Sequence, residues 1–271
     1  MTGVTFKGRL GNQLFQLYFL IYLRRNNPRK FIFFVNPHHA YLTKYFDLGT
    51  YRNLVLGSKL YSVFTRYLPL ILPFKDVYIQ NFVAPREIKP KDFTIYNGYF
   101  QTDWYVKHTP GNYTVKVKQK YIDLFNEKFG ELFAKNKTIV VHIRRTDYMT
   151  YGKRDISLPI GYFQKRLAEV ENLDSYKVLF VSDDIEFVKA SFENKPNFIF
   201  SVNDEITDFQ IIQNADIAII SNSSFAWWAA YLSEKNNKVI APKNWMAFRI
   251  GREHPRGVMT DKFTWVGVED N

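Results

Sequence analysis

The sequence predicts an α/β protein whose second half forms a parallel, Rossmann-like sheet of five strands. From Thr138 onward, short apolar segments alternate with helical segments, and polar residues follow most of the apolar ones. This alternation is typical of βαβ units, whose right-handed crossovers bring the carboxyl ends of the strands to one edge. Ligands of open parallel sheets bind beyond that edge. The expected strands are residues 138–143, 177–181, 197–201, 216–220 and 238–241, and the expected helices are residues 160–172, 184–192, 206–214 and 224–235.

The most informative stretch ends the first of these strands. Residues 138–141 have β-branched strand character, and the chain then presents His142, Arg144, Arg145 and Asp147. Two neighbouring guanidiniums favour a bound polyanion, because each is permanently charged and its fork matches phosphate oxygens. An arginine pair alone is better explained by salt bridges at a strand end. The imidazole and the carboxylate beside the pair favour a functional site.

Two further strand ends carry polar residues. Asp183 and Asp184 follow the second strand, where they can accept hydrogen bonds from a base or sugar, or one of them can cap the next helix. Ser221-Asn222-Ser223-Ser224 precedes the helix expected at residues 224–235. Hydroxyls and N–H groups at a helix N-terminus form an anion cradle. The same serines also suit ordinary N-capping, and the two roles are compatible.

The first half predicts a second α/β unit that begins with a glycine turn. A strand at residues 3–7 leads into Gly8-Arg9-Leu10-Gly11-Asn12-Gln13 and an apolar helix at residues 14–25. Such a turn brings backbone N–H groups up to a phosphate or sugar, although many glycine turns are only turns. Asn12 is a candidate helix cap, and Arg9 favours an anion. Further strands are expected at residues 30–35, 76–80 and 93–100.

The strand at residues 93–100 leads into Asp103 and Trp104. This pair suits sugar recognition, because a sugar ring can stack on the indole and its hydroxyls can bond to the carboxylate; a surface turn with a packed Trp explains it equally well. An amphipathic helix at residues 115–135 then precedes a linker. We therefore expect two domains, residues 1–136 and residues 137–271.

Composition limits the classes of function. The 271 residues contain no cysteine, which excludes disulfides, a cysteine nucleophile and cysteine-based zinc sites. The formal charge of +11 attracts phosphates, nucleic acid or anionic membrane surfaces without choosing among them. No signal peptide is visible, and no apolar run approaches the roughly 20 residues that span a bilayer. We expect a cytoplasmic protein, with peripheral contact to the inner membrane surface as an alternative that the apolar, lysine-flanked residues 59–75 suggest. A core helix followed by an extended strand is the more usual explanation of such a stretch.

Several nucleotide-binding signatures are absent. The chain has no Gly-x-Gly-x-x-Gly fingerprint, no Gly-Lys-Ser/Thr loop and no Asp-x-Asp motif for a divalent cation. His38 and His39 lack a third ligand at metal-binding spacing. A diphosphate bound without metal requires fixed cations and helix N-termini, which Arg144, Arg145 and the helix that begins near Ser224 would supply.

Three blocks of the sequence resemble the inverting, GDP-fucose-dependent fucosyltransferases, above all the bacterial α-1,2-fucosyltransferase family. They are Gly8-Arg-Leu-Gly-Asn-Gln-Leu-Phe-Gln16, His142-Ile-Arg-Arg-Thr-Asp-Tyr148 and Ser221-Asn-Ser-Ser-Phe-Ala-Trp-Trp228. The blocks follow the family's order over most of the chain, and Thr146 departs from the glycine that the family usually has. The resemblance implies a GT-B fold of two Rossmann-like domains that face a cleft, with the acceptor on residues 1–136 and the donor on residues 137–271.

The resemblance also implies the reaction. L-Fucose would pass from GDP-β-L-fucose to the 2-hydroxyl of a galactoside in a surface glycan or oligosaccharide, with inversion to an α-1,2 linkage. Neither a cofactor nor an essential divalent metal is implied. Arg144 would neutralise the β-phosphate, and His142 and Asp147 would be the other catalytic members. Asp147 is preferred as the general base over His142 and Asp103. Arg145 would be either a structural residue or a second phosphate contact. The implied donor contacts are Arg145, Asn222, Ser223, Ser224, Arg9, Gly11, Asn12 and Asp183, and the expected acceptor contacts are Asp103 and Trp104.

Three rival functions fit parts of the pattern. A GT-B transferase for another donor, such as GDP-mannose, would share these motifs. A nucleic-acid-binding protein would explain the basic charge, but the two arginines are focused at one strand end rather than interleaved with aromatic residues. A non-catalytic sugar-binding protein would bind glycans without transferring fucose.

Overall fold

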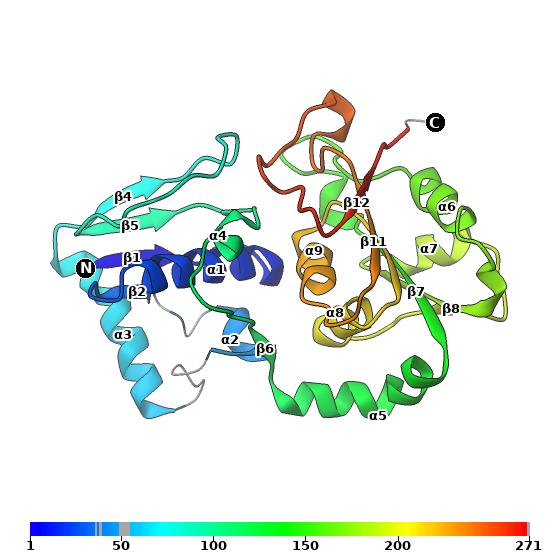
Figure 1. The fold of residues 1–271 in the computed structure, drawn as a ribbon, viewed down its shortest axis with the longest axis horizontal. Helices are drawn as coiled ribbons and strands as arrows, with labels where there is room; N and C mark the ends of the chain where they lie inside the picture. Colours follow the sequence, from blue (N-terminus) through cyan, green and yellow to red (C-terminus); the bar gives the residue numbers. More distant parts are fainter. Residues whose placement is uncertain (36, 38–39, 49–54, 270–271) are drawn as a thin grey trace. The chain divides into compact units, whose positions relative to one another are not determined.

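The structure is a computed structural model that describes residues 1–35, 37, 40–48 and 55–269 (Figure 1). The described chain forms two compact units. The N-terminal unit comprises residues 1–118 and 255–258, and the C-terminal unit comprises residues 119–254 and 259–269. The division therefore follows Lys118, whereas the sequence suggested a boundary after residue 136, and the helix at residues 119–135 belongs to the C-terminal unit.

The N-terminal unit is built on a parallel sheet with strand order β2-β1-β5-β4. Strands were expected at all four positions. A two-stranded antiparallel pair, β3 and β6, was not expected, because each strand is only two residues long. The elements are β1 (Thr2–Thr5), α1 (Leu10–Asn26), β2 (Ile32–Val35), α2 (Leu42–Tyr45), β3 (Phe46–Asp47), α3 (Leu56–Ile71), β4 (Lys75–Tyr78), β5 (Thr94–Asn97), α4 (Trp104–Lys107) and β6 (Lys116–Val117).

Alternation along these strands separates the two faces of the sheet. Tyr96 faces α1, where its ring centroid lies 5.9 Å from that of Phe19. Its neighbour Ile95 points the other way and clusters with Phe33 and with Leu68 of α3. Helices α1 and α3 therefore cover opposite faces, as expected for βαβ crossovers that run in opposite directions from β1 and from β2.

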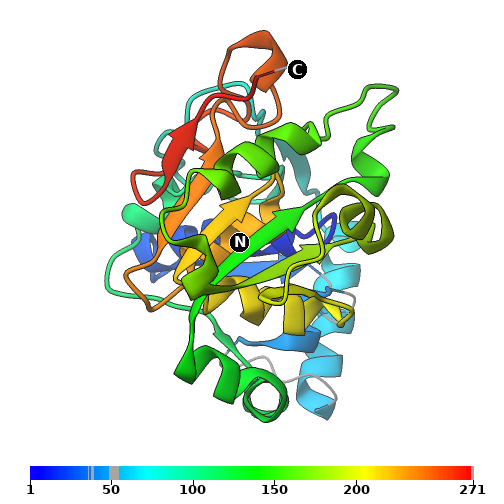
Figure 2. The ribbon, with the colours of Figure 1, turned by 90° about the vertical axis from the view of Figure 1, so that its right-hand side faces the viewer.

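The C-terminal unit contains a parallel sheet with strand order β12-β11-β10-β7-β8-β9, whose arrows share one direction in Figure 2. This confirms the predicted Rossmann-like sheet and adds a sixth strand, β12, which has only three residues. Its strands are β7 (Lys137–Ile143), β8 (Tyr176–Ser182), β9 (Phe198–Phe200), β10 (Ile217–Ile220), β11 (Lys238–Pro242) and β12 (Thr264–Val266), and its α-helices are α5 (Gln119–Lys135), α6 (Ile160–Ala168), α7 (Ile185–Ser191), α8 (Glu205–Gln213) and α9 (Ser224–Tyr231).

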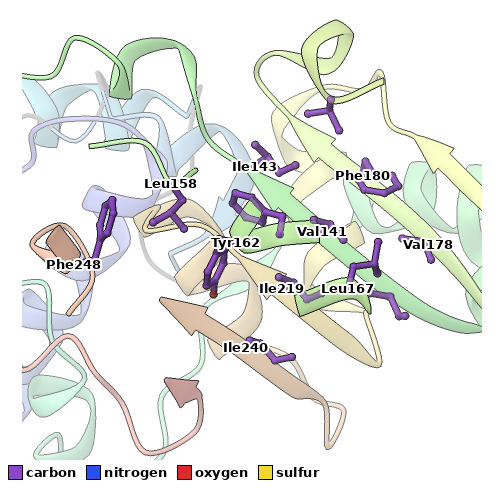
Figure 3. Close-up of a cluster of buried hydrophobic side chains, with 13 residues drawn as sticks. Val141, Ile143, Leu158, Tyr162, Leu167, Val178, Phe180, Ile219, Ile240 and Phe248 are labelled. Carbon is purple, nitrogen blue, oxygen red and sulfur yellow. The ribbon is translucent and has the colours of Figure 1, made fainter. Parts of the chain in front are cut away.

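One hydrophobic cluster of this unit lies between one face of the sheet and helices α6 and α7. Figure 3 shows Val141, Val178 and Ile219 from neighbouring strands with Tyr162 and Leu167 of α6. These side chains are nearly or completely buried, so the strands are held on this face by apolar contact. Helices α8 and α9 contact strands β7 and β10 of the same sheet. His142 follows Val141 on β7, so its side chain points to the face opposite that of Val141, because successive side chains of a strand alternate between the two faces.

The direction of the crossovers changes between β7 and β10. From β7 the chain passes through α6 to β8 on one side, and from β10 it passes through α9 to β11 on the other. The two strands are direct neighbours, and His142 is paired with Ile220 near their carboxyl ends. Open α/β sheets bind ligands at such a switch point, because the loops after the two strands leave in opposite directions.

Candidate active site

The carboxyl ends of β7 and β10 carry two of the three polar motifs predicted from the sequence. Ile143 ends β7, and Arg144 to Tyr148 form the following turn. Ile220 ends β10, and Ser221 to Ser223 connect it to α9. Because β8 is the other neighbour of β7, Asp183 and Asp184 follow at the same edge. The structure therefore brings these predicted donor-side residues together.

His142 is a buried link between the two strands. Its Nδ1 lies 2.9 Å from Ser221 Oγ, and its carbonyl oxygen accepts the Ser221 N–H at 3.1 Å. Burial, assisted by the neighbouring Arg144 guanidinium, lowers the pKa of His142 to about 3. The imidazole is therefore neutral at physiological pH and is a poor acceptor for a substrate proton. Its contacts suit a residue that positions the turn after β10.

Arg144 and Asp147 form an ion pair within the turn after β7. Arg144 Nε donates to Asp147 Oδ1 at 2.9 Å, and Nη2 lies 2.7 Å from the same oxygen. Arg144 Nε also lies 3.3 Å from Asp183 Oδ2. The Arg144 side chain is 18% exposed, whereas that of Asp147 is 45% exposed. The guanidinium is thus oriented by two carboxylates at the edge of the sheet.

Arg145 is directed toward α7. Its Nε donates to Asp184 Oδ2 at 3.2 Å, and its guanidinium carbon lies 3.6 Å from the centroid of the Phe187 ring. An ion pair and a cation–π contact therefore fix this side chain. Of the two roles that the family resemblance allows, the contacts match the structural one, and a phosphate contact stays a prediction.

The two aspartates after β8 have separate tasks. Asp183 accepts the Arg145 N–H at 2.9 Å and also accepts the Thr146 hydroxyl. Asp184 caps α7 by accepting the Phe187 N–H. Asp183 therefore holds the turn after β7, Asp184 caps α7, and a role for Asp183 in donor binding stays a prediction. Thr146, which departs from the family's usual glycine, uses its hydroxyl in this network.

The segment before α9 combines a buried amide with a helix start. Asn222 is fully buried; its Nδ2 donates to the Ile156 carbonyl at 2.8 Å, and within the described chain its Oδ1 has no hydrogen-bond partner. Ser223 occupies the N-cap position of α9 but makes no side-chain cap bond, and Ser224 is the first helical residue. Ordinary capping therefore does not explain Ser223, while the helix start retains the polarity that suits an anion.

Tyr148 joins the two strand ends, a role that sequence reasoning did not assign. Its hydroxyl donates to the Asn222 carbonyl at 3.3 Å, and its ring lies 5.7 Å from the Arg144 guanidinium carbon. Burial raises the pKa of Tyr148 to about 12, so the phenol stays protonated. The position of Tyr148 in the His142–Tyr148 block was the one feature of the sequence that could have indicated this role. The resulting site has one oriented cation, buried hydroxyls and a helix N-terminus, which together suit a phosphate group.

The glycine turn of the N-terminal unit lies before α1. The helix begins at Leu10 with Arg9 at the N-cap, so the expected start at residue 14 and the expected cap at Asn12 are both wrong. Asn12 Oδ1 instead accepts a hydrogen bond from Gln101 Nε2 at 2.9 Å, which joins this turn to the loop after β5. Gly11 is buried within the helix, and donor contacts by these residues stay predictions.

Two glutamines in the same block have roles that were not predicted. Gln16 Oε1 accepts the Lys7 N–H at 2.8 Å, and its Nε2 donates to the Gly98 carbonyl at 2.9 Å. Gln13 donates to the Gly8 carbonyl and accepts the Leu42 N–H. Each buried amide satisfies backbone groups of separate segments, so much of this motif shapes the turn itself.

Asp103 and Trp104 lie at the start of α4. Asp103 is buried and pairs with Lys107 Nζ at 2.8 Å. The Trp104 ring stacks on His108, with centroids 3.9 Å apart and planes 15° apart. Neither the carboxylate nor the indole lines the cavity of about 560 Å³ beneath α3, which Leu17, Phe34 and Tyr61 help to line.

No group of three or more His, Asp or Glu side chains suited to a metal ion occurs among the described residues, and His38 and His39 lie outside them. None of the described helices has the length and hydropathy needed to cross a membrane.

The family profile described as Glycosyl transferase family 11 matches residues 1–269 of this chain. Similar curated proteins include the Escherichia coli O-antigen biosynthesis glycosyltransferase WbnK, 33% identical over 144 residues, and the Escherichia coli alpha-1,2-colitosyltransferase, 30% identical over 141 residues. The first alignment covers 49% of this chain and 48% of the relative, and the second covers 46% of each. The chain thus spans about half the length of the curated relatives it matches.

Solved structures share the fold at low sequence identity. The α-1,6-fucosyltransferase NodZ, soaked with GDP-fucose, aligns with a TM-score of 0.52 at 11% identity over 86% of this chain and 92% of that one. POFUT1 in complex with GDP gives 0.51 at 13% identity, with coverages of 89% and 98%. A family 9 glycosyl transferase from Veillonella parvula gives 0.54 at 12% identity, with coverages of 98% and 85%. The predicted GT-B-like α/β fold is confirmed.

Proposed function

Because this chain belongs to glycosyltransferase family 11, we propose that it transfers L-fucose from GDP-β-L-fucose to the 2-hydroxyl of a galactoside, with inversion to an α-1,2 linkage. Fucosyltransferases among its structural neighbours, in complexes with GDP or soaked with GDP-fucose, support the donor. The curated relative that is an alpha-1,2-colitosyltransferase supports the linkage. The single observation that carries the proposal is the oriented Arg144 guanidinium at the switch point.

In this proposal the C-terminal unit binds the donor diphosphate. Arg144 faces the β-phosphate, and the Ser223 hydroxyl and the N–H groups at the start of α9 bind the remaining oxygens. Charge develops on the leaving GDP as its bond to the fucose C1 breaks, and a guanidinium already held in place stabilises that charge with little reorganisation. These groups make a divalent metal unnecessary for the departure of GDP.

Asp147 takes the proton of the attacking hydroxyl in the same proposal. Without donor, its carboxylate is paired with Arg144. A bound diphosphate competes for that guanidinium and releases the carboxylate to act as a base. The acceptor oxygen then attacks C1 from the face opposite the diphosphate, GDP leaves with the bonding electrons, and the hydroxyl proton passes to Asp147. His142, whose pKa is about 3, positions Ser221 instead.

The N-terminal unit holds the galactoside in this proposal. The Trp104 indole offers an apolar ring face to a sugar, and Asp103, beside it, can accept a bond from a sugar hydroxyl. Lys107 fixes the Asp103 carboxylate, so substitution of Lys107 is expected to weaken acceptor binding and raise KM for the acceptor without changing the affinity for GDP.

A second candidate function differs only in the sugar that is transferred, and the colitosyltransferase among the curated relatives favours it. A diphosphate site built from Arg144, Ser223 and α9 would serve GDP-fucose and another GDP-sugar equally well. In this proposal these groups contact the diphosphate, which the two donors share, and not the sugar. Competition between GDP-fucose and GDP-colitose or GDP-mannose in one reaction distinguishes the donors. A larger kcat/KM for either rival would replace GDP-fucose in the proposal.

The test is release of GDP from GDP-fucose in the presence of EDTA, with a panel of terminal β-galactosides and a control without acceptor. Acceptor-dependent release, with a fucosyl-galactoside product, is the expected result. Linkage analysis by NMR then assigns the 2-position. The absence of both turnover and GDP-fucose binding would contradict the proposal, as would turnover that EDTA abolishes and a divalent cation restores.

A further inference from the structure

Helix α3 of the N-terminal unit exposes a continuous apolar stripe. We define the α3 face as the side chains that are about half exposed or more along this helix. At 100° per residue these positions fall within an arc of about 120° on the helix surface. Leu70 and Ile71 are 77% and 78% exposed. The members of the α3 face are Leu56, Leu60, Val63, Phe64, Tyr67, Leu70 and Ile71.

The polarity of α3 is the reverse of that of an ordinary surface helix. Its buried positions are Ser58, Ser62, Thr65 and Leu68, of which three are small hydroxyl residues. The Thr65 hydroxyl donates to the Ser62 carbonyl at 3.2 Å. A surface helix normally buries its apolar stripe and exposes its polar one. The large apolar side chains of α3 are therefore available to an external partner.

The charge around the α3 face selects that partner. Between Val55 and Lys75 the chain carries Lys59, Arg66 and Lys75 and no acidic residue. Lys59 and Arg66 are exposed and lie along one border of the stripe. A second copy of the chain would present the same positive charge, and a neutral apolar partner would leave these cations without a counter-ion. An anionic lipid surface offers both an acyl layer and phosphates.

We propose that α3 lies in the interface of an anionic lipid bilayer, parallel to the membrane plane. The α3 face enters the acyl boundary, while Lys59 and Arg66 along its border contact lipid phosphates. The geometry describes surface attachment rather than a span, since α3 has only 16 residues. The proposal is independent of the transferase activity, because none of its residues belongs to the candidate active site.

Flotation of the full chain with lipid vesicles tests this proposal. We expect the protein to float with vesicles of phosphatidylcholine mixed with phosphatidylglycerol at least about tenfold more than with phosphatidylcholine alone, because several cations contact the surface. High salt should weaken binding, since it screens the lipid phosphates. A protein that floats with neither kind of vesicle, or equally with both, would overturn the proposal.

Paired variants locate the surface. Leu60→Ser/Phe64→Ser removes two apolar contacts, and Leu124→Ser/Ile250→Ser, at exposed apolar positions of the C-terminal unit, is its matched control. We expect the first pair to reduce flotation about tenfold or more and the second to leave it unchanged. Far-ultraviolet circular dichroism and melting temperature confirm that both variants fold. Equal losses in the two pairs would refute the assignment to α3.

A second pair of variants tests the contribution of the basic side chains to vesicle binding. Lys59→Glu/Arg66→Glu should abolish the preference for anionic vesicles, whereas Lys120→Glu/Lys137→Glu, at exposed lysines elsewhere, should retain most of it. Light scattering gives the oligomeric state of each protein and so tests the rival occupant, a second copy of this chain. A wild-type dimer that the Leu60→Ser/Phe64→Ser variant dissociates, with vesicle binding unchanged, would assign the α3 face to a second copy of this chain.

Discussion

At the scale of single residues, the environment of each side chain separates roles that the sequence left together. Arg144 and Arg145 are neighbours in the chain, yet one is held by Asp147 and Asp183 at the sheet edge and the other by Asp184 and Phe187. The sequence predicted that this strand end would carry the site. The family resemblance assigned the β-phosphate to Arg144, but the local pattern alone could not separate the two arginines. Part of what holds them, namely Asp183, Asp184 and Phe187, comes from the segment after β8.

His142 illustrates the same limit, and its protonation can be measured directly. Burial holds the pKa of His142 at about 3, so its NMR resonances should stay constant between pH 5 and pH 8. A histidine in an unstructured peptide, which titrates near its ordinary pKa of about 6.5, is the reference. A midpoint for His142 between pH 6 and pH 7 would contradict the buried, neutral imidazole and return it to the candidates for general base.

At the scale of elements, local patterns predicted most strands and helices but not their non-local contacts. Runs of apolar residues located β7, β8 and β10, and strand β12 was missed because its Thr-Trp-Val segment is too short and mixed to form such a run. The early start of α1 was missed because Gly11 and Asn12 resemble turn residues, although both lie within the helix. Residues 255–258 return to the N-terminal unit, which no local pattern indicates.

This returning segment depends on a glycine. Gly257 has a φ of +82°, and a Cβ there would lie 2.8 Å from Pro85 Cγ and 2.9 Å from Thr102 Oγ1. Gly257→Ala should therefore lower the free energy of unfolding by about 2–4 kcal/mol, through backbone strain and overpacking together. Urea unfolding measures the change.

Gly251→Ala is the control for backbone strain alone. Gly251 has a φ of +72°, but nothing lies within 4 Å of its added Cβ, so we expect a loss of only about 1 kcal/mol. Equal losses in the Gly251 and Gly257 variants would show that residues 255–258 are not packed closely against the N-terminal unit.

At the scale of the whole molecule, two buried groups of the C-terminal unit oppose each other in the pH dependence of stability. The native His142 resists a proton that the unfolded chain accepts, so its contribution is lost as the pH falls from about 6.5 toward 3. Burial raises the pKa of Asp208 to about 6, so the native carboxyl keeps a proton that the unfolded chain releases. Its contribution is lost as the pH rises from about 4 to 6.

In the Asp208→Asn variant, the free energy of unfolding should keep the pH dependence that His142 produces and lose the opposing one of Asp208. The amide cannot ionise, so the variant gains stability relative to the wild type as the pH rises, by about 1–2 kcal/mol between pH 4.5 and pH 7. Urea unfolding at a series of pH values measures this gain. A curve for the Asp208→Asn variant that runs parallel to that of the wild type would contradict a raised pKa at Asp208.

The central claim is that Arg144, rather than its neighbour, stabilises the departing diphosphate. Its most direct test compares the turnover of GDP-fucose by Arg144→Ala and Arg145→Ala, with melting temperatures measured for both proteins. Arg144→Ala should stay folded and lose at least about a hundredfold in kcat, because a positioned transition-state cation is absent. Arg145→Ala should retain most of its kcat and lose thermal stability instead. Near-normal turnover by a folded Arg144→Ala protein would contradict the account.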